Sequence, residues 1–437
     1  MDMVVGKNYL ESLLQGEPQL RPSPLSWFNN IRASAVERAG TLKIPTTRDE
    51  EWRFTDISPL AKLSFQPVQE APEVKKEDIA RFYLDEAQAT LVFVDGHYMP
   101  RLSRGSNTAS TELVVTNLRE ALMTHPREIE SHLGRHAAFE GKLFSALNTA
   151  FLHDGALVIV PRNEAIERPV HLLFVATQAE SASHPRCLLI AQSGSAVTVV
   201  EDYVTLQEGA YITNAVTEIA IEDNAQVDHT RVQRDSMNAF HIANCAARLG
   251  RSSRYRSVSA AFGARISRYD LNAVMAAEGA ECDVDGLALI KERQLADTHT
   301  SIDHAKPDGT SRQLHKCIVD GAAHAVFNGK IIVRAGAQHT DSSQSSRNLL
   351  LSARAHVDTK PQLEIFADDV KCAHGATVGQ LDTEELFYLK SRGLSALGAR
   401  NLLTYAFGAE VIDRIPVASL KRELERTVLE QTQRVEQ

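Results

Sequence analysis

The chain has 437 residues, of which 43% are hydrophobic and 24% charged, and its formal net charge is −9. This length allows two or three domains with a large buried core, and the acidic balance argues against nucleic acid or an anionic membrane as the main partner. No apolar run approaches the roughly 18–20 residues of a membrane-spanning helix, and the N-terminus lacks the basic and apolar regions of a secretory signal. The five cysteines are widely spaced without a CxxC pair, which favours a reducing cytoplasm over a disulfide framework or a self-sufficient zinc or cluster motif.

Residues 1–150 are predicted to form a mostly helical domain with one small hairpin. Ser26 precedes an apolar stripe at i, i+4 spacing that Gly40 can terminate. The hairpin is expected around Asp95-Gly96, because this pair supplies the positive φ that a type I′ turn needs. Two further amphipathic stretches follow, at residues 118–133 and 139–151.

Residues 151–380 have a different sequence pattern, in which short runs rich in β-branched residues recur. Most runs follow one cadence, a turn residue, Ala, a polar residue and then an apolar residue or His, which places side chains alternately on two faces. The cadence begins at Gly194, Asn224, Gly263, Gly279, Gly321 and Gly336. Because no helical stretch long enough for a βαβ crossover intervenes, we predict a mainly β solenoid, a parallel β-helix. The irregular spacing leaves a β-sandwich as the alternative.

The segment Ala367–Gln380 combines several kinds of side chain that can ligate a metal or transfer protons. Cys372 and His374 are two residues apart, so in a strand they share a face. Such a pair can bind iron or zinc or relay protons; equally, it can be a packed thiol and a hydrogen-bonded imidazole. One Cys and one His do not close a metal site, so a ligand role requires groups from elsewhere or from a partner.

Histidines and arginines are frequent in the predicted solenoid. In a solenoid one column of side chains stacks coil on coil, so His324, His339, His356 and His374 could form a ladder, although none has the local spacing of a ligand set. The arginines are interpreted as a solvated outer face that would bind nucleic acid poorly. They are Arg251, Arg254, Arg256, Arg265 and Arg268.

Residues 381–437 are predicted to form a helical domain. Asp382 and Glu385 resemble a capping box that opens the first helix, and Ser395 caps a second helix that Gly408 is expected to end. A third helix starts near Pro416 and carries Leu420, Leu424 and Val428 on one face. The helices are expected either to cap the end of the solenoid or to present a groove to another protein.

Several long motifs resemble the SufB/SufD family of iron–sulfur cluster assembly proteins, and the similarity runs from roughly residue 20 to residue 415 in the family's order. Arg48–Phe54 (Arg-Asp-Glu-Glu-Trp-Arg-Phe) is similar to the SufD branch of that family. The other matching motifs are Phe327–Lys330, Asn348–Ser352, Lys360–Ile365, Asp368–Gly379 and Leu386–Gly393.

The resemblance implies a right-handed parallel β-helix between N-terminal (1–150) and C-terminal (381–437) helical domains. It implies a non-catalytic scaffold subunit of the SufBCD complex, linked to iron acquisition and cluster formation. This subunit would pair with SufB through the β-helix (151–380), or with itself when alone. It implies that Cys372 and His374 lie near the SufB interface, where they would share a transient iron or cluster site with SufB, and that no cluster is held by the chain alone. The SufC ATPase would bind the C-terminal helices, with contacts from Phe387, Tyr388, Lys390, Ser391 and Arg392.

The alternative function is a polysaccharide lyase or hydrolase, because β-helices often act on sugars and Asp368-Asp369 offers two acids. Adjacent strand residues face opposite ways, which is wrong for a joint site. A hexapeptide-repeat acyltransferase would need a strict six-residue apolar repeat, which the sequence lacks. The sequence also contains no GxSxG and no phosphate-binding P-loop, so ATP hydrolysis by this chain is not expected.

Overall fold

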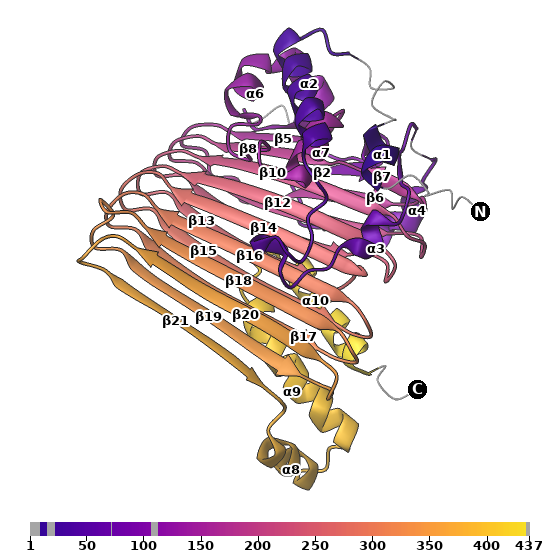
Figure 1. Cartoon of the computed structure of the whole chain (residues 1–437), viewed down its shortest axis with the longest axis vertical. Coiled ribbons are helices and arrows are strands. Elements are labelled where there is room, and N and C mark those ends of the chain that lie inside the picture. Colours follow the sequence, from indigo (N-terminus) through magenta and orange to yellow (C-terminus); the bar gives the residue numbers. More distant parts are fainter. Residues whose placement is uncertain (1–8, 15–21, 71, 106–111, 434–437) are drawn as a thin grey trace.

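The computed structural model describes residues 9–14, 22–70, 72–105 and 112–433. They form a mainly β structure, 40% strand and 24% helix, built as a β-solenoid of about 8 turns with helices near both termini (Figure 1). The prediction of a parallel β-helix flanked by helices is confirmed. The β-sandwich alternative is wrong, because neighbouring solenoid strands are parallel and one coil apart. The proposed domain boundaries at residues 150 and 380 stay predictions.

From β8 onward each coil contributes one strand to each of two sheets, so strands that follow one another in sequence alternate between them. Sheet 1 consists of β4 (Val114–Asn117), β5 (Gly155–Val160), β8 (Arg186–Ala191), β10 (Ile212–Ile221), β12 (Phe240–Leu249), β14 (Ile266–Met275), β16 (Leu295–His304), β18 (His324–Val333) and β20 (His356–Ile365). In addition, β7 (Ser181–Ser183) pairs with β10, and β1 (Gln66–Pro67) pairs with β7. Sheet 2 consists of β3 (His97–Tyr98), β2 (Ala89–Val94), β6 (Val170–Ala176), β9 (Ala196–Thr205), β11 (Gln226–Arg234), β13 (Arg254–Ala261), β15 (Glu281–Ile290), β17 (Thr310–Val319), β19 (Asp341–Leu350) and β21 (Lys371–Gly379).

The turn-Ala cadence marks corners of the coil. Asn224 and Gly321 have φ of 60° and 64°, the left-handed conformation that Asn and Gly adopt most readily. The alanine that follows closely in each case, Ala225 or Ala323, is 0% exposed. A small side chain therefore fills the tight corner, and the strand begins directly after it.

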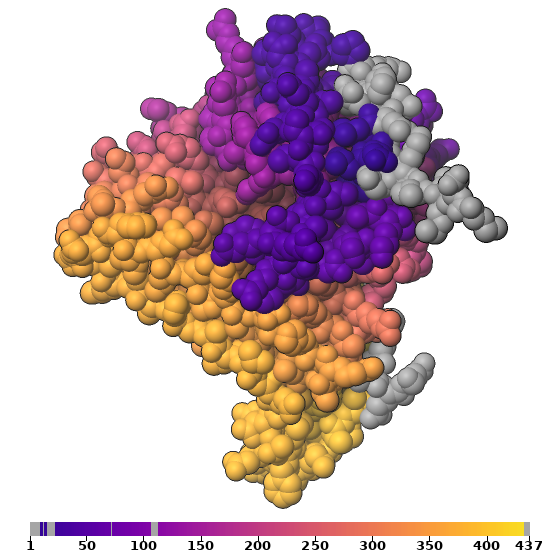
Figure 2. Space-filling view, viewed as in Figure 1, coloured from indigo at the N-terminus to yellow at the C-terminus, as the bar shows by residue number. Residues whose placement is uncertain are grey.

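Most N-terminal helices lie on the outer face of sheet 1 (Figures 1 and 2). Their core joins Tyr9 and Phe144 to Ile212, Phe240 and Ile266 of the solenoid. The predicted hairpin is confirmed, since β2 and β3 pair around Asp95 and Gly96. The helices of this region are α1 (Tyr9–Leu14), α2 (Ser26–Thr41), η2 (Glu50–Trp52), α3 (Ser58–Ala61), α4 (Lys76–Ile79), η3 (Ala80–Phe82), α5 (Leu118–Thr124), α6 (Pro126–His132) and α7 (Leu143–Ala150). Of these, α4 and η3 instead pack on the outer face of sheet 2 through Ile79 and Phe82.

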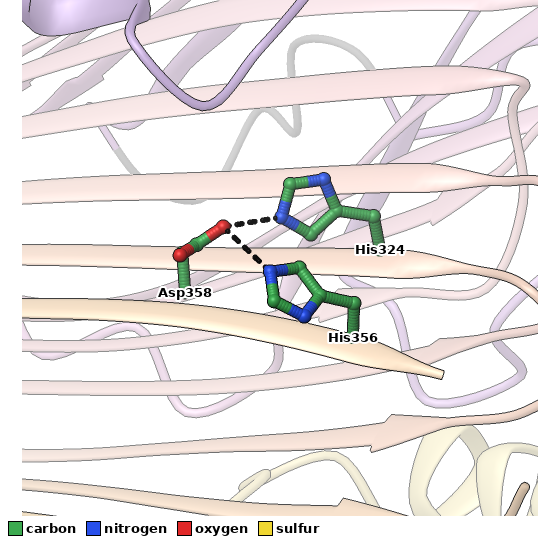
Figure 3. Close-up of side chains that lie close together, drawn as sticks. All are labelled: His324, His356 and Asp358. Carbon is green, nitrogen blue, oxygen red and sulfur yellow. Dashed lines mark hydrogen bonds and ion pairs between the residues drawn. The ribbon is translucent and has the colours of Figure 1, made fainter. Parts of the chain in front are cut away.

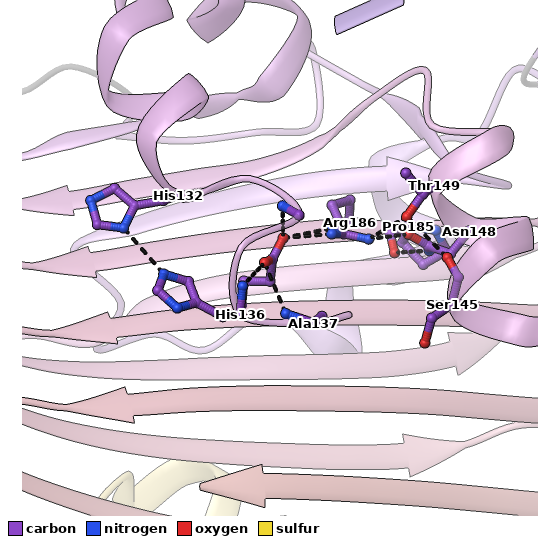
Figure 4. Close-up of polar contacts among 10 residues, drawn as sticks. His132, His136, Ala137, Ser145, Asn148, Thr149, Pro185 and Arg186 are labelled. Carbon is purple, nitrogen blue, oxygen red and sulfur yellow. Dashed lines mark hydrogen bonds and ion pairs between the residues drawn. The ribbon is translucent and has the colours of Figure 1, made fainter. Parts of the chain in front are cut away.

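A buried ion pair attaches this helical layer to the solenoid. Arg186 on β8 and Glu218 on β10 are both 0% exposed, and Arg186 Nε donates to Glu218 Oε1 at 3.1 Å. The backbone N–H groups of Gly134, His136 and Ala137, just after α6, also donate to the Glu218 carboxylate at 2.8–3.1 Å (Figure 4). One carboxylate therefore holds both a strand and the loop after a helix.

The C-terminal helices are α8 (Thr383–Ser391), α9 (Ala396–Ile412) and α10 (Ala418–Gln433). Helices α9 and α10 pack on the outer face of sheet 2, and the predicted apolar face of α10, Leu420, Leu424 and Val428, is 0% exposed. They therefore do not cap the last coil, contrary to one of our two expectations. Gly408 does not end α9 either. A Cβ added at Gly408 would lie 3.4 Å from Ile318, an ordinary van der Waals contact, so the helix packs against the sheet here with room for only a small side chain.

Helix α8 projects away from the solenoid (Figure 1) and contains no buried residue. The predicted cap is confirmed in part, because the Asp382 carboxylate accepts hydrogen bonds from the N–H groups of Glu384 and Glu385. Among the described residues, no helix has both the length and the apolar character needed to cross a membrane.

Candidate functional site at the open end of the solenoid

The last coil of the solenoid leaves two strand edges unpaired. In the described part of the chain, β20 pairs only with β18 and β21 only with β19. All but one of the β21 residues are exposed, and the apolar side chains of Ile365, Phe366 and Val378 are 40%, 64% and 49% exposed around these strands. Free edges together with exposed apolar side chains are the features by which another chain adds to a sheet.

Cys372 and His374 lie on β21, one of these two edge strands. The register places Cys372 opposite Ser342 and His374 opposite Gln344, and both of these β19 side chains are buried inside the solenoid, 1% and 3% exposed. Cys372 and His374 therefore share the inward face of the last coil. Cys372 is half-buried against the apolar cluster of Ile331 and its neighbours, whereas His374 is exposed.

The electrostatics of Cys372 favour its neutral form. Partial burial and the nearby Asp341 carboxylate raise the pKa of the Cys372 thiol above its usual value. A thiolate is the form that binds a metal or cluster. A nearby positive charge, such as a metal ion, is therefore needed to stabilise the thiolate form of Cys372. Within the described residues, the His374 side chain makes no hydrogen bond or ion pair and is free to contact a partner chain.

The remaining cysteines are core residues. Cys187, Cys245, Cys282 and Cys317 are at most 3% exposed, and burial raises the pKa of Cys317 to about 12. They are inert thiols under ordinary conditions. The last coil therefore offers one thiol and one imidazole, fewer than the four ligands that an iron–sulfur cluster usually has.

The five residues predicted to contact an ATPase lie on α8 or directly after it. Phe387 and Tyr388 are 73% and 55% exposed, and Lys390, Ser391 and Arg392 are also exposed. The Arg392 guanidinium lies over the Tyr388 ring at 5.2 Å, and Ser391 Oγ donates to the Tyr388 carbonyl at 2.7 Å. These contacts hold an aromatic and cationic surface on a projecting helix.

The predicted ladder of four histidines is wrong. His324 and His356 are register partners on sheet 1, but His374 lies on sheet 2 and His339 occupies a turn with φ of 58°. The reason is that these histidines follow one another at 15–18 residues, about half of the 29–32 residues that separate register partners in this part of the solenoid, so successive histidines lie on different sides of the coil. The sequence alone does not identify Asp358 as a neighbour of His324 and His356. This contact becomes predictable once His324 and His356 are known to be register partners one coil apart.

The interpretation of the arginines as a solvated face is wrong for Arg268. Its side chain is 2% exposed, pairs with Asp270 and Asp297 and lies 4.5 Å from the Trp52 ring. His299 pairs with both Asp297 and Glu51. The acidic and aromatic residues of the segment Arg48–Phe54 therefore attach it to sheet 1 through a network of charges.

The two acids of the alternative hydrolase site lie in the turn before β21. Asp369 Oδ2 is 3.3 Å from His339 Nε2, and both Asp368 and Asp369 are exposed. Asp369 thus pairs with a cation-forming side chain rather than facing Asp368. This geometry gives the sugar-cleaving alternative no support.

Fold and site together define a class of protein: a β-solenoid that presents two free strand edges with a thiol and an imidazole, and a projecting helix with exposed aromatic side chains. Comparison with known proteins identifies the family. Residues 174–407 match the family described as "SUF system FeS cluster assembly, SufBD core domain", and residues 3–172 match the "SufBD protein N-terminal region". The chain belongs to the SufBD family of iron–sulfur cluster assembly proteins, as the motifs predicted.

Similar proteins span nearly the whole chain. An iron–sulfur cluster assembly SufBD family protein of Synechocystis is 41% identical over 91% of this chain and 90% of its own length. The iron–sulfur cluster assembly proteins SufD of Escherichia coli and Bacillus subtilis are 32% and 28% identical, over 87% and 96% of this chain and 88% and 96% of their own lengths.

Proposed function

We propose that this chain is a non-catalytic scaffold subunit of a SufBCD complex, linked to iron acquisition and cluster formation. In this role it pairs with SufB through the edges of β20 and β21 and binds the SufC ATPase through its C-terminal helices. The observation that carries the proposal is the open last coil, which places Cys372 and His374 on an unpaired strand. Its five unpaired cysteines suit a reducing cytoplasm.

Pairing through the last coil follows from the free hydrogen-bonding groups of its edges. A related solenoid that adds its own edge strands continues both sheets and covers Ile365, Phe366 and Val378. Without SufB, a second copy of this chain offers the same chemistry, so a homodimer is the expected state of the isolated protein.

The shared edge also answers the shortage of ligands. Cys372 and His374 supply two groups, and SufB supplies the others, so iron or a nascent cluster is held transiently between the chains as cargo. The chain alone holds no stable cluster. A cation bound between the chains offsets the burial and the Asp341 charge that keep Cys372 neutral.

Binding of SufC follows from the exposed aromatic residues of α8 and from the link between α9 and the solenoid. Phe387 and Tyr388 present anchors typical of protein interfaces. Lys316 on β17 donates to the Phe407 carbonyl at 2.9 Å and pairs with Glu410. A displacement of α8 and α9 by the ATPase would therefore reach sheet 2 directly.

Two surface variants separate the two binding roles. Val378→Lys places a charge on the free edge and is expected to abolish co-purification with SufB while SufC is retained. Phe387→Ser with Tyr388→Ser is expected to do the reverse. Met123→Ser, which removes another exposed apolar side chain (66% exposed), is the matched control and retains both partners.

A reconstituted complex tests the role of the last coil. His374→Ala and Cys372→Ser are each expected to lower iron and acid-labile sulfide per complex without loss of either partner. Retention of SufB by Val378→Lys would refute the edge interface, and an unchanged cluster yield in both last-coil variants would refute the shared site. Truncation before α8 is a poorer test, because it removes α9 and α10 from the core on sheet 2.

A further inference from the structure

Three potential metal ligands converge on the outer face of sheet 1. His324 Nε2 lies 2.8 Å and His356 Nε2 3.2 Å from the same Asp358 oxygen, Oδ2. The two imidazole rings are 4.9 Å apart, and one ligand atom of each of the three residues lies within 4.8 Å of the others (Figure 3).

The fold explains this convergence. His324 and His356 are register partners on the adjacent strands β18 and β20, so their side chains leave the same face of the sheet about 4.8 Å apart. Asp358 follows His356 by two residues on the same strand and therefore shares that face. Two imidazoles and one carboxylate thus occupy three corners of a square, whose fourth corner is the apolar Val326.

The two nitrogen–oxygen distances fit a small cation. An ion about 2.1 Å from each ligand atom places neighbouring ligands about 3.0–3.4 Å apart, for ligand angles between those of an octahedron and a tetrahedron. Both measured nitrogen–oxygen separations are within about 0.2 Å of that range. Each imidazole would coordinate through Nε2 and carry its proton on Nδ1, and neither Nδ1 is a buried atom without a partner.

The surroundings suit a cation as well. His324 and Asp358 are only 26% and 25% exposed, so two of the three ligands are already held in place, and His356 (64% exposed) leaves the ion reachable from solvent. The ammonium groups of Lys330 and Lys360, which lie farther along the same two strands, are engaged by Glu364 and Glu50. These ion pairs reduce the repulsion that free lysines would exert on an ion.

We propose that His324, His356 and Asp358 form a binding site for one divalent first-row transition-metal ion, with Zn²⁺ or Fe²⁺ as the typical occupant. Two imidazoles and a carboxylate, without a thiolate, favour such ions over Cu⁺ or an iron–sulfur cluster. Three protein ligands leave coordination positions for water or for a group from a partner chain. The site lies on the outer face of sheet 1, whereas Cys372 and His374 lie on the inward face of sheet 2.

Equilibrium dialysis of the purified full chain against Zn²⁺, and anaerobically against Fe²⁺, tests the proposal. The unaltered protein is expected to retain one equivalent of metal. His324→Ala, His356→Ala and Asp358→Asn are each expected to weaken binding at least tenfold. His339→Ala is the matched control, because it removes another exposed, carboxylate-paired imidazole from this end of the solenoid and should leave binding unchanged.

A second variant keeps this result independent of the proposed scaffold role. Cys372→Ser combined with His374→Ala is expected to keep the metal, since neither residue belongs to the outer site. Thermal unfolding followed by circular dichroism checks that each variant is folded, and added Zn²⁺ should raise the melting temperature of the unaltered protein but not of Asp358→Asn. Absence of binding, or binding that survives substitution of all three residues together, would overturn the proposal.

Discussion

Glu218→Gln is expected to destabilise the protein strongly although it changes one carboxylate oxygen to an amide group. The Glu218 carboxylate accepts from three backbone N–H groups and from Arg186 in a site without solvent. A glutamine has a single acceptor oxygen, so its amide group would face at least one backbone donor. The substitution also leaves Arg186 buried without its counter-charge, although Asn148 and Thr149 still accept from it.

The magnitude follows from these losses. Removing one partner of a buried ion pair costs about 3–5 kcal/mol, and the lost backbone hydrogen bonds place Glu218→Gln in the upper half of that range. The matched control is Glu281→Gln, because Glu281 is 53% exposed and pairs with the exposed Arg254 at 3.3 Å. An exposed pair of this kind contributes about 0–1 kcal/mol.

Urea unfolding of both variants, with the free energy of unfolding taken from the midpoint and slope, measures the difference. Burial acts to raise the pKa of Glu218, but Arg186 and the backbone N–H groups hold it below its usual value. The contribution of Glu218 is therefore fully present above about pH 4.3 and is lost as the pH falls through the lowered pKa. Hydrogen exchange at residues 134–137 should also accelerate in Glu218→Gln. An equal loss of stability in Glu218→Gln and Glu281→Gln would refute the reasoning.

Three further predictions concern other parts of the molecule. Burial acts to lower the pKa of His299, but Asp297 and Glu51 raise it to about 9. The stabilisation that His299→Gln removes should therefore be fully present below about pH 6.5 and vanish as the pH rises through 9. Urea midpoints of the unaltered protein and of His299→Gln across this pH range would show the difference. Gly408→Ala should raise stability by about 0.5–1 kcal/mol, because Ala is the better helix former and its Cβ fits. Gly408→Leu should cost about 1–3 kcal/mol by overpacking against Ile318, and equal urea midpoints for the two variants would contradict the packing of α9 at this position. A maleimide should label Cys372 alone in the folded chain and all five cysteines in urea; rapid native labelling that survives Cys372→Ser would show that the core thiols are accessible.

The fold was predictable because the sequence features that specify its corners and helix ends are local. A corner residue with positive φ that is closely followed by a small buried Ala occurs at Asn224, Gly279 and Gly321, and recognising it needs no knowledge of distant contacts. Helix caps such as Asp382 and Ser395 are local in the same way. The end of α9 was mispredicted because the helix continues to Ile412 while packing on sheet 2 beside Ile318, a tertiary contact that a breaker rule does not include.

The candidate site was predictable only where spacing decides geometry. Cys372 and His374 share a face because residues two apart in a strand must, whatever the register. Which face points inward, and which histidines stack, depends on the number of residues in each coil. That number differs between coils: Phe240 is the register partner of Ile266, whereas His324 partners the more distant His356. Asp358 therefore joins two histidines by register, which the sequence alone does not give.

The geometry of the last coil places strand pairing and the outer histidine–aspartate cluster on different surfaces, although both use residues of β20. Strand addition uses hydrogen bonds in the plane of a sheet, so a partner at the edges of β20 and β21 encloses the inward-facing Cys372 and His374. The outer face of sheet 1, with His356 and Asp358, stays perpendicular to that contact and reachable from solvent. A metal bound there would remain exchangeable while a proposed partner closed the inner site. Removal of the outer ligands should therefore change metal uptake without changing assembly, and removal of the inner ligands should change cluster formation without changing metal uptake by the isolated chain.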